Sequence, residues 1–119
     1  MIYSIDFDGT IVENKWPKIG ELKTEAKVFI KLLKSAGHEW ILNTMREDEK
    51  LEEALNFLKE NDIAPDYVNE NHPMLIKKYD NNPRKIYADV YIDDHNAGGL
   101  VWPSIRIKNA KEERTEKNE

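Results

Sequence analysis

Residues 2–12, IYSIDFDGTIV, constrain the fold of this chain more than any other stretch. They begin as an apolar run typical of a buried β-strand and reach Asp6 and Asp8, one residue apart, followed by Gly9 and Thr10. Paired carboxylates are costly to bury in a core, but they suit a hard divalent cation, which prefers oxygen ligands. The stretch therefore predicts a strand that brings a metal site to a glycine turn.

The rest of the chain alternates between the apolar spacings of strands and helices. Apolar runs predict five strands, at residues 2–7, 40–44, 67–68, 88–94 and 105–107. Apolar residues at helical spacing predict three helices, one from Leu22 to a stop at Ala36 and Gly37, one from an N-cap at Asp48 to Asn61, and a short one within residues 72–82. Pro17 and Gly20 mark residues 13–21 as an irregular loop.

This alternation is typical of an α/β fold with a mostly parallel sheet and right-handed crossovers. We expect a three-layer, Rossmann-like arrangement with about five strands in the central sheet. A chain of 119 residues is large enough for one core, which we place at residues 1–109. Residues 110–119 carry mixed charges without apolar spacing and are expected to form a frayed or disordered tail.

Composition excludes several classes of function. The chain has no cysteine, so disulfides, thiolate metal sites and cysteine nucleophiles are absent, and any nucleophile must be oxygen or nitrogen. A net charge of −5 disfavours broad electrostatic binding to nucleic acid or to an anionic membrane. Apolar runs of only a few residues predict neither a membrane span nor a signal peptide, so a cytoplasmic location is the default expectation.

Chemically useful side chains fall where three predicted strands end. Asp6 and Asp8 follow the first strand, Thr44 closes the second, and Asp93 with Asp94 close the strand at 88–94. In open α/β sheets the ligand crevice lies beyond the carboxyl ends of the strands. We therefore expect these residues, which are distant in sequence, to meet at one edge of the sheet.

The sequence Asp6-x-Asp8-Gly9-Thr10 after a hydrophobic strand resembles the nucleophile motif of the haloacid dehalogenase (HAD) superfamily of phosphohydrolases. The resemblance implies that Asp6 attacks a phosphoryl group to form an aspartyl-phosphate. It implies that Asp8 is the general acid and base and offers its backbone carbonyl to the metal. Gly9 and Thr10 would let the chain turn tightly and approach a phosphate. The plainer alternative is that Asp6 caps the following turn.

Thr44 resembles the second motif of the same superfamily, a hydroxyl residue that closes a hydrophobic strand. The resemblance implies that its hydroxyl and the backbone amide of Met45 bind a phosphoryl oxygen. Arg46 stands two residues further on and could offer a bidentate fork to a phosphate or substrate. Threonine is also common in strands, and an ordinary surface arginine near a helix start is an almost equal alternative for Arg46.

Asp93 and Asp94 resemble the acidic fourth motif, whose commonest form reads Gly-Asp. Adjacent carboxylates repel unless a cation shares their charge. Together with Asp6 and Asp8 they imply a Mg²⁺ site, in which we expect Asp94 to be the direct ligand and Asp93 to orient a bound water or a lysine. The assignment between the two stays open, and a solvated turn before His95 is the alternative.

The superfamily also has a lysine that neutralises the nucleophile and the phosphate, and Lys77, Lys78 and Lys85 compete for that role. We favour Lys85 because the deoxyribonucleotidase-like branch has a lysine shortly before an Ala-Asp-x-x-Ile-Asp-Asp segment, which residues 88–94 match. An extended chain would place Lys85 roughly 26 Å from the acidic pair. The strand would therefore have to begin near Val90. A solvent-facing lysine is the alternative for all three.

The resemblance is to small members without a cap domain, because the two gaps at residues 13–21 and 69–84 are too short for a second core. It implies a magnesium-dependent phosphomonoester hydrolase that acts on a phosphorylated small molecule or polymer end, and the branch resemblance suggests a nucleotide or a nucleic-acid end. The absence of a cap implies either an open site or a site that a neighbouring subunit of a homo-oligomer covers. Phosphoryl transfer to an acceptor other than water, a phosphate- or Mg²⁺-binding module with little turnover, and a receiver-type domain are the alternatives.

Overall fold

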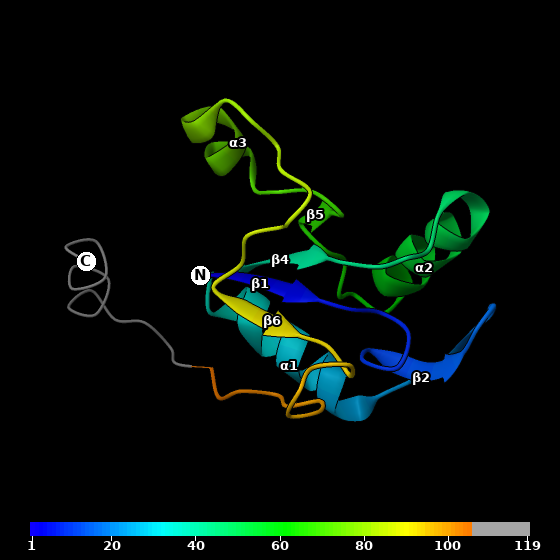
Figure 1. Cartoon of the computed structure of the whole chain (residues 1–119). Coiled ribbons are helices and arrows are strands. Elements are labelled where there is room, and N and C mark those ends of the chain that lie inside the picture. Colours follow the sequence, from blue (N-terminus) through cyan, green and yellow to red (C-terminus); the bar gives the residue numbers. More distant parts are fainter. Residues whose placement is uncertain (106–119) are drawn as a thin grey trace.

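Four parallel strands form the central sheet of the computed structural model, which describes residues 1–105 (Figure 1). The sheet has the order β5-β4-β1-β6, formed by β1 (Ile2–Ile5), β4 (Glu39–Leu42), β5 (Tyr67–Val68) and β6 (Val90–Ile92). The predicted parallel sheet is confirmed, with four strands where about five were expected. Ile105 is not in a strand, and Ile107 and the tail at 110–119 lie outside the described residues.

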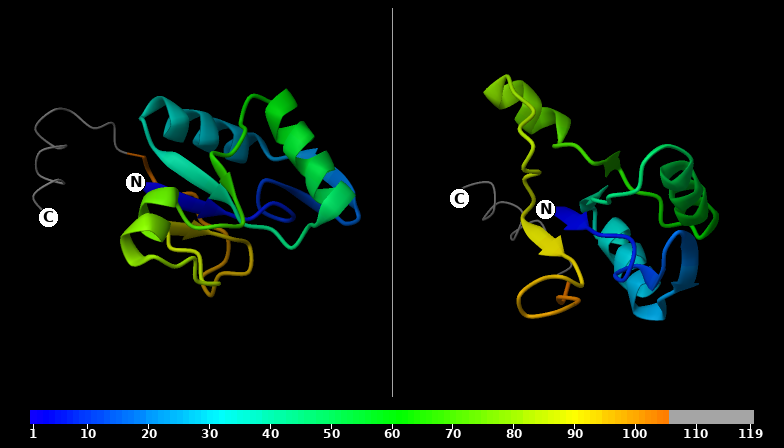
Figure 2. Two further views of the ribbon diagram at one scale, coloured as in Figure 1. Left: turned by 90° about the horizontal axis from the view of Figure 1, so that it is seen from above. Right: turned by 45° about the vertical axis from the view of Figure 1, so that its right-hand side comes forward.

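Three helices connect the strands of this sheet: α1 (Thr24–Ser35), α2 (Asp48–Glu60) and α3 (Pro73–Tyr79). Helices α1 and α2 lie on one side of the sheet and α3 lies on the other (Figure 2). The chain moves outward from β1 to β4 and β5, and then returns to the other side of β1 to form β6. The reversal makes the carboxyl end of β1 a topological switch point, where ligand crevices form in such sheets.

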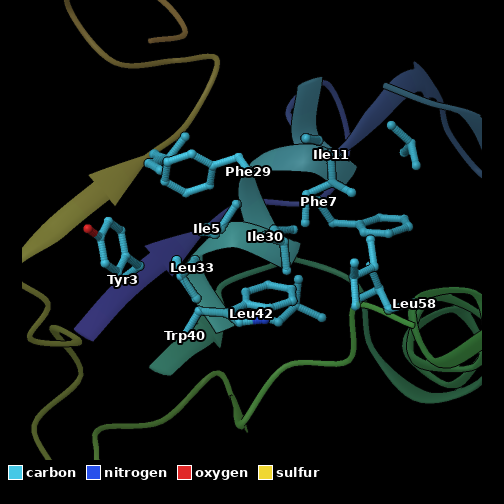
Figure 3. Close-up of a cluster of buried hydrophobic side chains, with 14 of the residues drawn as sticks. Tyr3, Ile5, Phe7, Ile11, Phe29, Ile30, Leu33, Trp40, Leu42 and Leu58 are labelled. Carbon is cyan, nitrogen blue, oxygen red and sulfur yellow. The ribbon is translucent and has the colours of Figure 1, made fainter. Parts of the chain in front are cut away.

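The main core fills the space between the sheet and the two helices on that side (Figure 3). Alternate residues of the first strand and its extension, Tyr3, Ile5 and Phe7, point into it. They meet the apolar stripe of α1, where Phe29 and Leu33 are buried. The predicted amphipathic character of this helix is therefore confirmed.

We expect Leu33→Ala to lower the free energy of unfolding by about 2–5 kcal/mol, because Leu33 is fully buried and truncation leaves a cavity. Leu32→Ala is a matched control, since the neighbouring side chain in the same helix is 54% exposed and should cost well under about 1 kcal/mol. Urea unfolding of both variants measures the difference. Equal losses would contradict this placement of α1.

Residues 13–21 do not form the irregular loop that Pro17 and Gly20 indicated. They lie almost entirely in a β-hairpin of β2 (Val12–Lys15) and β3 (Lys18–Leu22), joined by a cis Trp16-Pro17 bond. Pro17 occupies the turn, and Gly20 lies where a Cβ would come within 2.0 Å of the Glu13 carbonyl oxygen. Pro17 and Gly20, which indicated a loop in the sequence, are thus the residues that this short hairpin needs.

Helix α1 begins later than predicted, helix α2 has a different N-cap from the predicted one, and both helices end where expected. Leu22 belongs to β3, so α1 begins at Thr24. The N-cap of α2 is Glu47, without a side-chain cap bond, and Asp48 is its first residue. Ala36 and Asn61 are the C-caps of the two helices, as predicted. Among the helices of residues 1–105, none is long and apolar enough to span a membrane.

Candidate active site

Three carboxylates meet at the carboxyl end of the sheet. Asp6 follows β1, and Asp93 and Asp94 follow β6, its parallel neighbour. The pairing of Ile5 with Ile92 sets this register, and the Asp6 amide donates to the Ile92 carbonyl at 3.0 Å. One carboxylate oxygen from each of the three aspartates lies within 4.8 Å of the other two. The predicted convergence of Asp6 with the acidic pair is confirmed.

Thr10 holds two of these carboxylates in place. Its side chain is fully buried, and its hydroxyl lies 3.1 Å from Oδ2 of Asp6 and 3.2 Å from Oδ1 of Asp94. The hydroxyl also accepts the backbone amide of Asp94 at 3.0 Å. A single hydroxyl proton is shared between two carboxylates, so Thr10 orients the acidic cluster. Sequence reasoning gave this residue a phosphate-binding role in the turn, and the link to Asp94 was not foreseen.

Gly9 lets the turn pass directly over Asp94. Its φ is +86°, and a Cβ at this position would lie 2.3 Å from Oδ2 of Asp94. The expected need for glycine is confirmed, although the close approach is made to a carboxylate. The Nζ of Lys23 donates to the Gly9 carbonyl at 2.8 Å, which brings a half-buried cation to the same turn. No sequence signal distinguishes Lys23 from the other lysines around α1.

Burial, the charge of Asp93 and a hydrogen bond with Asp94 raise the pKa of Asp6 to about 7. At Asp94, burial acts to raise the pKa, but hydrogen bonds with Asp93 and Asp6 and the nearby His95 leave it below its usual range. The opposite directions favour a proton on Asp6, hydrogen-bonded to Asp94, when the pH falls below about 7. A divalent cation can take the place of this proton, so the all-oxygen donor set fits Mg²⁺.

The side chain of Asp8 pairs with Arg46, whereas that of Asp6 lies beside Asp93 and Asp94. Its two carboxylate oxygens accept from Nε and Nη2 of Arg46, both at 2.8 Å. The Asp8 side chain is therefore not among the carboxylates of the cluster, and the implied use of its backbone carbonyl by a metal stays a prediction.

Arg46 lies inside the protein, with a side chain only 1% exposed. All five N–H groups of its guanidinium have protein acceptors: Asp8 twice, and the carbonyls of Pro17, Lys18 and Lys50. The interpretation of Arg46 as an ordinary surface arginine is therefore wrong. Its donors are engaged by protein acceptors in this structure, and its phosphate-binding role stays a prediction. A pairing between residues 38 positions apart leaves no mark in local sequence.

Thr44 and Met45 follow β4, on the other side of β1 from β6. The Thr44 amide donates to Asn69, and its hydroxyl accepts the backbone amide of Arg46 at 3.1 Å. The Met45 side chain is 96% exposed. These contacts place both residues at the predicted edge of the sheet, and their phosphate-binding roles stay predictions.

Lys85 lies on the segment that leads into the amino end of β6, whereas Asp93 and Asp94 follow its carboxyl end. It lines a cavity of about 460 Å³ beside α3, together with Lys78. Lys77 also belongs to α3. The structure therefore brings none of the three candidate lysines to the acidic cluster.

The fold and the site define an α/β protein with a parallel sheet and an acidic cluster at the carboxyl ends of its central strands. No protein-family model matches this chain, and no curated protein matches it. A solved structure of a conserved protein coded by a locus from Bacteroides thetaiotaomicron is similar, with a TM-score of 0.76 and 33% sequence identity. The match covers 100% of this chain and 92% of that chain. This chain belongs to the same family as that conserved protein.

Proposed function

We propose that this protein is a magnesium-dependent phosphomonoester hydrolase of the HAD type, with Asp6 as its nucleophile. The observation that supports this most is the meeting of Asp6, Asp93 and Asp94 within 4.8 Å at the switch point of the sheet. Such a group of oxygen donors suits Mg²⁺, and a phosphoryl group brought there would face a strand-held carboxylate. The substrate is a phosphorylated small molecule or polymer end, for which a nucleotide is one option.

In the proposed reaction an oxygen of Asp6 attacks phosphorus, and the bond from phosphorus to the leaving oxygen breaks. Asp8 gives its proton to that oxygen, and then takes one from a water that attacks the aspartyl-phosphate. Inorganic phosphate leaves and the Asp6 carboxylate is restored. Mg²⁺ held by Asp6 and Asp94 would offset the negative charge of carboxylates and phosphate. Thr10 keeps these two carboxylates in register through both steps.

The described part of the chain leaves this site with little cover. Only the β2–β3 hairpin is inserted between β1 and α1, and neither it nor the segment around α3 has a core of its own. Cap domains select small substrates by enclosing them, so an uncapped site favours a substrate whose remainder extends away from the protein. A terminal phosphate on an oligonucleotide or other polymer satisfies this condition.

Hydrolysis of para-nitrophenyl phosphate by the purified protein, with Mg²⁺ and then with EDTA, tests the proposal. We expect turnover with Mg²⁺, loss of at least about 90% of it with EDTA, and recovery when excess Mg²⁺ is returned. A set of nucleotides and 5′-phosphorylated oligonucleotides then compares substrate classes. Turnover that persists in EDTA, or no turnover of any ester, would contradict the proposal.

A second candidate function is a Mg²⁺- or phosphate-binding module with little turnover. It is favoured by one observation, the engagement of both Asp8 oxygens by Arg46, which leaves no free acid beside Asp6. Calorimetric titration with Mg²⁺ separates the two candidates when combined with the hydrolysis assay. Binding without hydrolysis identifies the module, and binding with hydrolysis identifies the enzyme.

A further inference from the structure

We propose that Arg46 is a positioning residue that ties the carboxylate of Asp8 to the tip of the β2–β3 hairpin, formed by Trp16, Pro17 and Lys18. Movement of the hairpin then releases Asp8 for its role as acid. This inference rests on the proposed function for the role of Asp8. The physical link between Asp8, Arg46 and the hairpin is independent of it.

The first part of this link is the ion pair itself. Arg46 is 1% exposed and Asp8 is 18% exposed, and two parallel N–H to oxygen contacts of 2.8 Å join them. Bidentate pairs of this kind fix geometry as well as adding energy. To reach a substrate oxygen, Asp8 has to turn at least one of its oxygens away from Arg46. That turn breaks one of the two contacts in a poorly hydrated place, so it needs a compensating movement of Arg46.

The second part is the contact of Arg46 with the hairpin tip. Nη2, which binds Asp8, also donates to the Lys18 carbonyl at 3.1 Å, and Nη1 donates to the Pro17 carbonyl at 3.4 Å. The guanidinium lies 4.9 Å from the centre of the Trp16 ring. The same nitrogen thus serves both the candidate acid and the hairpin, and the position of one constrains the other.

The third part anchors Arg46 to the body of the protein. Its guanidinium lies 5.2 Å from the centre of the buried Phe7 ring, and Nη1 donates to the Lys50 carbonyl in α2 at 3.4 Å. Phe7 and α2 are packed into the core, while the Trp16 side chain is 57% exposed. Of the segments that hold Arg46, the hairpin tip is therefore the one with room to move.

A purely structural ion pair is the competing explanation, and it differs in what loosening the hairpin does to kcat and to its pH profile. In our proposal, Asp8→Asn weakens the grip of Arg46 on the tip, because the charge that holds the guanidinium in place is lost. Arg46→Lys keeps a positive charge but cannot serve the carboxylate, two carbonyls and a ring at once, since an ammonium lacks the planar fork. Both variants should loosen the hairpin while the sheet stays closed.

Amide hydrogen exchange of the full chain tests this without any need for activity. We expect exchange in residues 12–22 to accelerate by about tenfold or more in Asp8→Asn and in Arg46→Lys, while exchange in Glu39–Leu42 stays unchanged. Glu21→Gln is the matched control, because it removes the same charge from an exposed position of the hairpin. If Arg46→Lys fails to fold, Trp16→Ala removes one contact of the guanidinium from the exposed side and should give a smaller acceleration.

Unchanged hairpin exchange in Asp8→Asn and Arg46→Lys would overturn the inference, whatever the activity of the protein. Acceleration with inactive wild-type protein would leave the physical link standing and contradict the proposed hydrolysis. With active protein, we expect Arg46→Lys to change kcat and its pH profile while KM for para-nitrophenyl phosphate changes less than about threefold. A loss of activity that only follows the loss of folded protein would favour a purely structural role for the Asp8–Arg46 ion pair.

Discussion

Asp6→Asn is expected to lower kcat for phosphate-ester hydrolysis by at least about 10³-fold, the scale at which loss of a covalent nucleophile acts. The amide of asparagine nearly matches the carboxylate in shape, so the neighbouring Thr10 hydroxyl keeps an oxygen partner at the 3.1 Å position. It lacks the negative charge needed to attack phosphorus and to bind a cation. Folding is expected to be retained, because substitution removes repulsion from Asp93 at a crowded site.

The measurement is single-turnover and steady-state kinetics with para-nitrophenyl phosphate at saturating Mg²⁺. Asp80→Asn is a matched control, because it makes the same chemical change at the exposed C-cap of α3, in a left-handed conformation that asparagine also adopts. It should leave kcat within about twofold. An Asp6→Asn protein that retains more than a tenth of wild-type activity would assign the nucleophile to another group.

The acidic cluster could be predicted because each part of it depends on local pattern and one general rule. A short apolar run ended by acids marks Asp6 and Asp94 as strand-end residues. Parallel strands then bring those ends to one edge. The exact neighbour relation of β1 and β6, which sets the distances, comes only from the structure.

The partners of Asp8 could not be predicted, because they depend on how the chain folds over itself. Arg46 reads in sequence as a polar residue near a helix start, yet it is buried by Phe7, Trp16 and the tip of the hairpin. Burial of a charge is tolerated only where a partner and acceptors meet it, and none of these lies near it in sequence except the Lys50 carbonyl. The hairpin was missed for a related reason, since Pro17 and Gly20 also mark irregular loops.

Lys85 illustrates a limit of analogy in placing a site residue. The spacing to Asp93 matched a known branch, but β6 is only three residues long, and the chain before it runs away from the cluster toward α3. A lysine that sequence analogy did not single out, Lys23, donates to the Gly9 carbonyl at 2.8 Å. Motif spacing thus places a residue along the chain, while the direction of the strand decides which end of the sheet it reaches.

Gly9→Ala is expected to lower kcat by about 10²-fold while costing only about 1–2 kcal/mol in the free energy of unfolding. The stability cost follows from φ of +86°, which an L-residue adopts with strain. The activity cost follows from a new Cβ that would lie 2.3 Å from Oδ2 of Asp94. A short carboxylate side chain can rotate away from this contact, so the fold survives but Asp94 leaves its place beside Asp6.

Two other glycines separate these effects. Gly99 has φ of +79° with open space around its Cβ position, so Gly99→Ala should show the stability cost without the loss of activity. Gly98 has open space and no positive φ, so Gly98→Ala should show neither. Urea unfolding and kinetics with para-nitrophenyl phosphate, made on all three variants, give the comparison. Full activity in Gly9→Ala would mean that the placement of Asp94 against the turn has no part in catalysis, whereas a selective loss in that variant ties turnover to the geometry of the acidic cluster.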